Sequence, residues 1–282
     1  MRVGIVAHRR TPTNVALART HTETRVLAPA DALRGLEEGD VALGRLDVSE
    51  ALDGIEVGLW ELARLQGAGV KVLNPPGALV AAHDKLATSR ILAGAGIPHP
   101  RTVHVTAANA ALPFPPPVVV KPRFGSWGRD VVLCETVSEL RAVLEHDRNR
   151  QWFRAHGALV QELVPPQGHD LRLVVAGCTV VGAIRRVAAP GEWRTNVALG
   201  ATREPVIAPP PAACGLAVAA ARAIEGDLVG VDLLPTPDGD HVVLELNGAV
   251  EFTQEYALEP GDVFERALAA ILPAAEPATS LA

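Results

Sequence analysis

LVGVDLLPTPDGDHVVLELN, at residues 228–247, has the pattern of two apolar strands joined by a tight turn. Asp238-Gly239 is a strong signal for a two-residue β-hairpin turn. Counting outward from that turn places Asp232 directly opposite Glu245. Asn247 lies two residues beyond Glu245, so the two side chains share one face of the strand.

Two carboxylates that face each other across a hairpin repel unless a cation lies between them. Oxygen ligands from Asp232, Glu245 and the Asn247 amide suit Mg²⁺ or Mn²⁺, and Mg²⁺ commonly accompanies a nucleotide phosphate. Strand alternation alone leaves a second interpretation open, in which Asp232 points to solvent and Glu245 is a surface residue. The first interpretation predicts a metal site in this hairpin.

The lysines are a second indication of function, because only three of the 26 basic residues are lysine. Lys121 ends the apolar run 118–121 and precedes the loop Gly125-Ser126-Trp127-Gly128. Glycine-rich loops let backbone N–H groups approach phosphate oxygens, although this loop lacks the Lys-Ser/Thr of a Walker A motif. An ordinary hairpin loop is the alternative. Lys85 follows a good helix cap, Asp84, where a cation opposes the helix dipole unless it binds an anion; a solvated lysine is the alternative.

Composition excludes several classes of protein. The 282 residues suggest about two domains, and 48% apolar with 21% charged residues is typical of a globular chain. A net charge of −6 without a basic stripe argues against nucleic-acid binding. The three cysteines form no C-x-x-C motif, which fits a reducing compartment such as the cytoplasm. The first residues lack a signal peptide, and prolines interrupt the longest weakly polar run, so we expect no membrane association. The scattered histidines, with His99 and His104 five apart across a proline, argue against a histidine metal site.

The patterning predicts an α+β protein. The first ~80 residues are expected to form a small α/β unit, with strands at 2–6 and 70–73 and a helix over 50–67. Further helices are predicted at 79–94, 136–146, 212–225 and 262–272. Strands are predicted at 118–121, 131–133, 158–162, 171–175, 179–184, 228–234 and 241–246. We expect the tail, 273–282, to be disordered.

Together these pieces resemble the ATP-grasp superfamily, in particular its RimK/LysX-like carboxylate–amine ligases. The resemblance is strong from about residue 70 onward and weak before it. The matching stretches, in chain order, are LNP 73–75, HDK 83–85, AGIPHP 95–100, VVKP 119–122, LVQE 159–162, GHDLR 168–172, Arg186, WRTN 193–196, GVD 230–232 and ELN 245–247.

The resemblance implies an α/β (α+β) ATP-grasp fold, in which two α+β lobes grip ATP. The implied domains are an N-terminal pre-ATP-grasp domain, a central lobe with the glycine-rich loop, a C-terminal lobe with the metal site, and a tail: 1–82, 83–165, 166–275 and 276–282.

The resemblance also implies a role for each matching residue. The residues implied to contact the ATP phosphates are Lys85, Lys121 and the loop Gly125, Ser126, Trp127 and Gly128. The backbone of Glu162, Leu163 and Val164 would bind adenine, and Asp170 would hold the ribose. Arg186 would face the γ-phosphate or acyl-phosphate, with Arg194 and Asn196 near the phosphates and acceptor. Two Mg²⁺ ions, or Mn²⁺, would be held by Asp232, Glu245 and Asn247.

The implied enzyme is an ATP-dependent ligase that forms C–N bonds. A carboxylate takes the γ-phosphoryl group of ATP, and the amine of an amino acid then displaces phosphate. LysX-like enzymes join an amino acid to the C-terminal Glu of a small acidic carrier protein, which is the first hypothesis here. A RimK-like glutamate ligase or small peptide ligase with another acceptor is an alternative, as is an ATP-binding regulatory protein on a decayed ligase fold. Relatives are often dimers or tetramers, so the resemblance implies a homo-oligomer.

The chain departs from the family pattern after Asn196. Many members carry an arginine and a Gly-Gly pair there, but this chain has Leu199 in place of the arginine and Ala201 in place of the second glycine. We expect this region to shape the acceptor pocket, so the departures bear on which acceptor is used.

Overall fold

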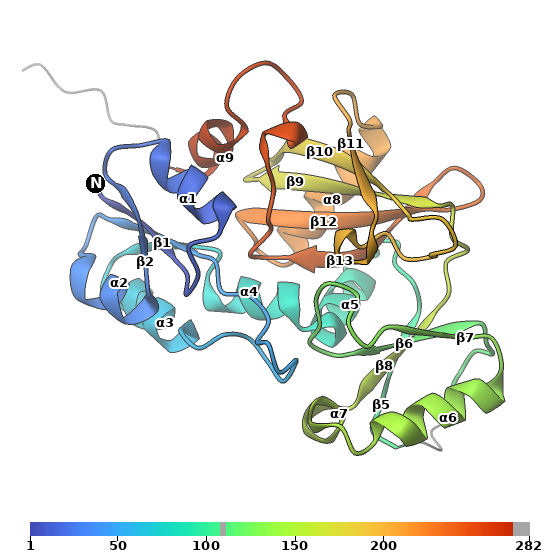
Figure 1. The fold of residues 1–282 in the computed structure, drawn as a ribbon. Helices are drawn as coiled ribbons and strands as arrows, with labels where there is room; N and C mark the ends of the chain where they lie inside the picture. The colour runs from blue at the N-terminus through green and yellow to red at the C-terminus, as the bar shows by residue number, and fades with distance from the viewer. Residues whose placement is uncertain (108–110, 273–282) are drawn as a thin grey trace, which may run out of the picture.

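The computed structural model describes residues 1–107 and 111–272. It contains three β-sheets with helices packed around them (Figure 1). The strands of each sheet come from one continuous part of the chain. The predicted tail at 273–282 lies outside the described residues.

The N-terminal sheet is parallel, with strand order β2-β1-β3-β4. Its strands are β1 (Val3–Val6), β2 (Thr24–Leu27), β3 (Val41–Gly44) and β4 (Lys71–Leu73). The crossover helices are α1 (Pro12–Arg19), α2 (Pro29–Gly35) and α3 (Leu59–Gly67). The α/β unit is therefore as predicted.

The helix predicted within 50–67 is shorter than expected, because it begins only at Leu59. Leu52, Gly54 and Gly58 adopt positive φ angles before it, which a right-handed helix excludes. The irregular segment ahead of the helix carries Val48 and Leu52 into the core of the central sheet. The apolar spacing of this segment thus reflects packing against another sheet.

The central sheet is antiparallel, with strand order β5-β8-β6-β7. Its strands are β5 (Thr102–Val105), β6 (Val118–Pro122), β7 (Val132–Cys134) and β8 (Ala158–Glu162). Helices α6 (Val137–Asp147) and α7 (Gln151–His156) pack against it, and Trp152 and Phe153 fill the core between them.

The helix predicted at 79–94 is two helices, α4 (Pro76–His83) and α5 (Lys85–Gly94). Asp84 interrupts them with an extended ψ of 96°, and its carboxylate caps α5 by accepting hydrogen bonds from the N–H groups of Leu86 and Ala87. The apolar pattern of the sequence continues on both sides of Asp84, so it gave no sign that one helix ends and another begins there. Residues of both helices share a core with the C-terminal sheet, and the predicted boundary after residue 82 falls inside the last turn of α4.

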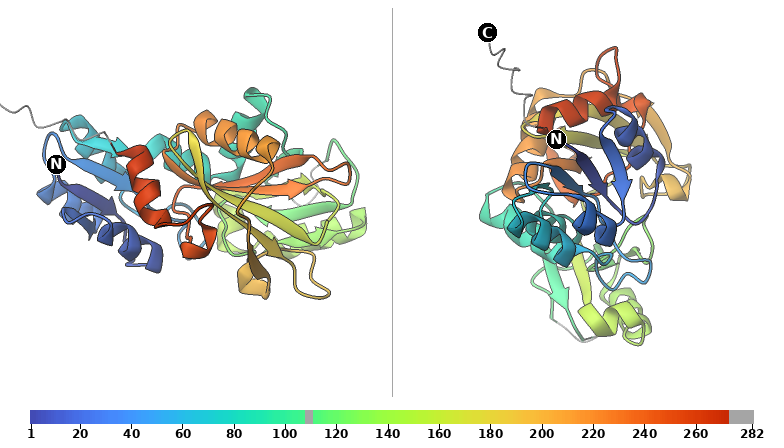
Figure 2. Two further views of the ribbon diagram at one scale, coloured as in Figure 1. Left: turned by 90° about the horizontal axis from the view of Figure 1, so that it is seen from above. Right: turned by 90° about the vertical axis from the view of Figure 1, so that its left-hand side faces the viewer.

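The C-terminal sheet is antiparallel, with strand order β11-β10-β9-β12-β13. Its strands are β9 (His169–Ala176), β10 (Thr179–Val187), β11 (Thr202–Pro205), β12 (Leu228–Pro235) and β13 (His241–Asn247). Helix α8 (Pro211–Ala223) covers one face and α9 (Val263–Ile271) the other (Figure 2). Two short 3₁₀ helices, η1 (Val197–Leu199) and η2 (Gln254–Tyr256), complete this part.

The β12–β13 hairpin places Asp232 opposite Glu245, as predicted, but by a different route. Near the turn Pro235 pairs with His241, so the connection is one residue longer than the predicted two-residue turn allows. The register then shifts between Asp232 and Leu233, where Leu244 is the extra residue of a β-bulge. The longer turn and the bulge cancel, which restores the predicted pairing at the carboxylates.

Among the described residues, no helix is long and apolar enough to cross a membrane.

Candidate active site

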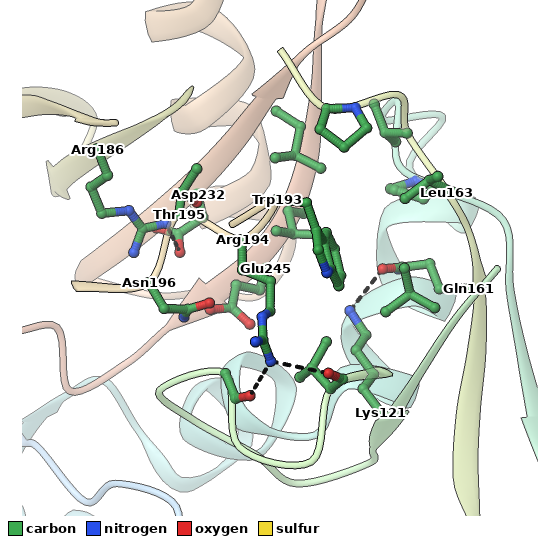
Figure 3. Close-up of a pocket in the computed structure, with 18 of the residues that line it drawn as sticks. Lys121, Gln161, Leu163, Arg186, Trp193, Arg194, Thr195, Asn196, Asp232 and Glu245 are labelled. Carbon is green, nitrogen blue, oxygen red and sulfur yellow. Dashed lines mark hydrogen bonds and ion pairs between the residues drawn. The ribbon is translucent and has the colours of Figure 1, made fainter. Parts of the chain in front are cut away.

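A cavity lies between the central and C-terminal sheets and contains most of the predicted site (Figure 3). Of the sixteen residues predicted from the sequence, all line this first cavity except Asp170 and Asn247. Lys121 and Gln161 lie on one side of it, and Arg186, Thr195 and Asn196 lie on the other. Residues distant in sequence therefore converge where the ATP-binding residues were predicted.

One part of the first cavity is apolar and suits a flat base. It is lined by Val119, Leu163, Trp193, Leu234 and Leu244. The predicted adenine hinge borders it, but two of its N–H groups are already engaged. Glu162 N–H donates to the Arg101 carbonyl at 2.9 Å, and Leu163 N–H donates to that of Pro117 at 3.3 Å. A base at this hinge is therefore left with the backbone of Val164 and the remaining carbonyl groups.

The two lysines form the cationic part of the cavity. Lys121 is buried and donates from Nζ to Oε1 of Gln161 at 2.7 Å, a neutral partner. Lys85 donates to the Gly125 carbonyl at 2.5 Å and lies 3.4 Å from a carboxylate oxygen of Glu245. Burial and the nearby charge of Lys85 lower the pKa of Lys121 to about 8. An ammonium without an adjacent carboxylate is a site for an anion such as phosphate.

This pKa predicts a pH-dependent affinity for ATP. As the pH rises above about 8, Lys121 in the free protein loses the proton that attracts phosphate. The dissociation constant for a non-hydrolysable ATP analogue should then rise by up to about tenfold per pH unit. In calorimetric titrations at pH 7 to 9.5, Lys121→Met should bind weakly with a flatter pH dependence. Lys71→Met, which removes an exposed lysine on β4, should behave like the wild type. Equal pH profiles for all three proteins would contradict the assignment.

A buried charge network joins the strands behind the lysines. Asp232 accepts hydrogen bonds from Nε and Nη2 of Arg172 at 2.6 and 2.7 Å, and from Nη2 of Arg186 at 2.7 Å. Burial opposes ionisation of Asp232, but the two guanidinium groups outweigh it and hold its pKa well below the usual value. Asp232 therefore fixes the positions of both arginines.

The predicted ribose contact of Asp170 differs from what the structure shows. Asp170 is completely buried and does not line the first cavity. It pairs with Arg186 through both carboxylate oxygens and accepts a hydrogen bond from Oγ1 of Thr195 at 2.6 Å. In this structure Asp170 positions Arg186, and the neighbouring His169 is the residue that lines the cavity.

The predicted metal ligands provide oxygen atoms of the right kind. Asp232 and Glu245 are paired across the hairpin, and the Oδ1 atom of Asn247 already accepts the Ala249 N–H at 2.9 Å. No group of three or more His, Cys, Asp or Glu side chains capable of holding a metal occurs in residues 1–107 and 111–272. Mg²⁺ usually takes one or two protein carboxylates and completes its shell with phosphate oxygens and water. Glu245 and the Asn247 amide are suitable oxygen ligands of this kind, whereas both carboxylate oxygens of Asp232 are already engaged by Arg172 and Arg186.

The glycine loop closes against the C-terminal lobe. Arg194 pairs with Glu192 and donates from Nη1 to the carbonyls of Gly128 and Val131 at 3.4 and 3.1 Å. A Cβ on Gly128 would lie 2.8 Å from Oδ1 of Asn196, and its φ is +70°. Gly128 is therefore required for this close approach, which brings the two lobes together over the cavity.

A second cavity, of about 330 Å³, extends from the first toward the N-terminal sheet. Seven residues line both cavities, and they include the two charged groups next to each other, Lys85 and Glu245. The shared residues are Lys85, Gly125, Ser126, Trp127, Arg186, Asn196 and Glu245. Two ligands, one bound in each cavity, would come together at this shared wall.

Sequence reasoning gave no role to several residues of the site. Arg172 lies in a matching stretch, yet only the pairing of β9 with β12 reveals that it binds Asp232. Gln161 and Thr195 likewise act through partners that are remote in sequence. The two departures from the family pattern, Leu199 and Ala201, line neither main cavity, whereas Val197 and Ala198 line the second.

Comparison with known proteins agrees with this geometry. A family model described as a RimK-like ATP-grasp domain matches residues 82–259. The glutamate–LysW ligase ArgX of Sulfurisphaera tokodaii is 34% identical over 218 residues, which cover 75% of this chain and 76% of the relative. A probable alpha-L-glutamate ligase of Xanthomonas campestris pv. campestris is 36% identical over 214 residues, covering 74% and 70% of the two chains.

The fold of this chain is also similar to those of solved ATP-grasp proteins. The crystal structure of a RimK-domain ATP-grasp protein from Sphaerobacter thermophilus superposes with a TM-score of 0.70 at 24% identity, covering 97% of this chain and 100% of that one. The ATP-grasp fold predicted from the sequence is thus confirmed, as is the predicted family, whose ligases use ATP and Mg²⁺. This chain belongs to the RimK-like ATP-grasp family and is an ATP-dependent carboxylate–amine ligase.

Proposed function

We propose that this ligase joins an amino acid to the C-terminal Glu of a small acidic carrier protein or peptide. The observation that carries the proposal is the wall that the two cavities share. ATP in the first cavity and an acceptor carboxylate in the second would meet at Lys85, Arg186 and Glu245. The name of the Sulfurisphaera relative, a glutamate–LysW ligase, supports a carrier as the acceptor.

The chemistry requires no protein nucleophile. An oxygen of the acceptor carboxylate attacks the γ-phosphorus of ATP, the bond to the β–γ bridging oxygen breaks, and ADP leaves. The amine then attacks the carbonyl carbon of the acyl-phosphate, the C–O bond breaks, and inorganic phosphate and a proton are released. Lys121, Lys85 and Arg186 would neutralise charge as it moves between these groups.

Mg²⁺ would supply further charge stabilisation at the phosphates, and we propose that Asp232, Glu245 and Asn247 hold two ions there. The contact between Arg194 and the glycine loop would exclude water, which would otherwise hydrolyse the acyl-phosphate. Asp170 would act indirectly by orienting Arg186.

A glutamate ligase that acts on another acceptor is the second candidate. The name of the Xanthomonas relative, an alpha-L-glutamate ligase, favours it. Both candidates share the acyl-phosphate and differ only in what occupies the second cavity. Homo-oligomerisation, use of Mn²⁺ and a cytoplasmic location stay predictions.

The proposal is tested by ADP release with Mg²⁺, ATP, L-glutamate and a synthetic acidic peptide that ends in Glu. We expect turnover to require the peptide, and mass spectrometry to find the peptide heavier by one glutamyl residue. Reactions that lack ATP, glutamate or peptide are the controls. Turnover with free small carboxylates but none with the peptide would contradict the carrier and favour the second candidate.

A further inference from the structure

The strand order of the N-terminal sheet reverses between β1 and β3. The chain passes from β1 to β2 at one edge, and then from β3 to β4 at the other. All four strands are parallel, so their carboxyl ends open on the same side. Open α/β sheets commonly bind ligands in the crevice at such a point. The residues that follow these two strands line the second cavity: Ala7, Arg9, Arg45 and Asp47.

Arg45 is the unusual residue in this crevice, because its side chain is completely buried. Its Nε donates to Oδ1 of Asn14 at 2.5 Å, and its Nη2 donates to the Val250 carbonyl at 2.6 Å and lies 3.3 Å from Glu251. Its Nη1 is buried without a hydrogen-bond partner among the described residues. Buried polar groups are normally satisfied, so an open donor on a fixed guanidinium indicates a ligand.

The second cavity is lined by cations and by carboxylates: Lys85, Arg9, Arg45, Arg172, Arg186 and Arg203 with Asp47, Glu56, Glu245 and Glu251. Arg172 and Arg186 are already paired with Asp232 and Asp170, whereas Arg45 keeps a donor without a partner among the described residues. His83 also lines it, but burial lowers the pKa of His83 to about 4, so this side chain is neutral at pH 7. Glu251 is already engaged, since it accepts a hydrogen bond from Thr11 at 2.7 Å as well as pairing with Arg45.

We propose that the crevice after β1 and β3 is a carboxylate subsite, in which Nη1 of Arg45 binds a carboxylate of the substrate that does not react. The inference rests on the proposed function, because the reacting carboxylate must lie at the wall shared with the first cavity. A substrate that ends in Glu has two carboxylates, one for each position. The carboxylate at Arg45 comes either from the C-terminus of the carrier or from the free amino acid.

Paired substrates distinguish these two sources. The first substrate set varies the acceptor: an acidic peptide ending in Glu carries either a free or an amidated C-terminal carboxylate. The second set varies the amine donor: L-glutamate is compared with L-glutamine and with L-isoglutamine. The wild type should prefer the free carboxylate in at least one set by about tenfold or more in kcat/KM, as expected for a charge-assisted hydrogen bond.

The variants are Arg45→Met, Arg45→Lys and, as a matched control, Arg185→Met. Arg185 on β10 pairs with Glu204 on the neighbouring edge strand β11, and it lines neither of the two cavities described above. Arg45→Met should abolish the preference in one set by raising KM, with little change in kcat, because the contact is remote from the reacting atoms. Arg45→Lys should show an intermediate preference, and Arg185→Met should match the wild type. The set in which the preference disappears identifies the source of the carboxylate.

The inference is overturned if Arg45→Met retains the wild-type preference in both sets. If that variant fails to fold, as judged by circular dichroism, Arg45→Lys with an unchanged preference overturns it equally. If the wild type forms no amide with any substrate, the proposed function fails, and calorimetry with glutarate tests the subsite by itself. Glutarate binding that weakens by about tenfold or more in the Arg45 variants, but not in Arg185→Met, then supports the subsite. Equal or absent binding overturns it.

Discussion

Replacing Asp232 with asparagine should lower both the stability and the activity of this ligase. Asparagine keeps the shape of the side chain but replaces one acceptor oxygen with an amide donor. Arg172 and Arg186, both largely buried, would then face a neutral group that satisfies only part of their hydrogen bonds. Removing one partner from a buried ion pair typically costs about 3–5 kcal/mol of unfolding free energy. Turnover should fall by at least about 100-fold, because Arg186 loses its position and the proposed metal site loses a charge.

Urea unfolding followed by circular dichroism measures the first effect, and ADP release measures the second. Asp240→Asn, an exposed change in the turn of the same hairpin, is the matched control and should leave both unchanged. The low pKa of Asp232 also fixes the sign of the pH dependence. Its contribution is present above the unfolded-state pKa of about 3.9 and is lost as the pH falls below it, so the stability difference should shrink there. An Asp232→Asn variant that unfolds at the wild-type urea concentration would contradict the network.

The pairing of Asp232 with Glu245 shows how much of the site could be predicted from the sequence. Turn chemistry and strand alternation depend on neighbouring residues, so they brought the two carboxylates together without reference to the rest of the chain. The same local rules missed both the longer turn and the bulge at Leu244, and the prediction held only because these two shifts cancel. Local pattern therefore predicted the pair, but not the backbone path that produces it.

Asp170 and Arg172 show where local pattern fails. They sit two residues apart on β9, which itself pairs with both β10 and β12. Their partners, Arg186 and Asp232, become neighbours only through that strand order. A family resemblance supplied a ribose role for Asp170, whereas burial and its two-oxygen pairing with Arg186 indicate a positioning role. Long-range strand order is the information that the sequence lacked.

For the N-terminal unit the sequence predicted the fold class, but not all of the individual strands and helices. The strand at 41–44 and the helices at 12–19 and 29–35 are short, and their apolar residues do not form long periodic runs. Arg45 follows such a strand, so neither its burial nor its open donor is visible in the sequence. The thin resemblance in this unit suggested that Arg45 faces the acceptor, but its burial and its Nη1, unpartnered among the described residues, are seen only in the structure, where the parallel sheet places it at the crevice.

Glu245→Gln should lower turnover without lowering stability, whereas the change at the facing residue Asp232 should lower both. The Glu245 side chain is 26% exposed, and its ion-pair partner is Lys85 at 3.4 Å. Partly exposed pairs of this kind contribute about 1 kcal/mol or less, so the urea midpoint should move little. Glutamine keeps one carbonyl oxygen but removes the negative charge, which should reduce ADP release by at least about 100-fold.

The matched control is Glu38→Gln, the same change at an exposed position that lines neither main cavity. The comparison of Glu245→Gln with Asp232→Asn is decisive because the two residues face each other in one hairpin yet differ in burial. If Glu245 serves the reaction and Asp232 serves both the reaction and the fold, only the second variant loses stability. Turnover by Glu245→Gln at the wild-type rate would remove Glu245 from the catalytic site and leave its pairing with Lys85 as its only role.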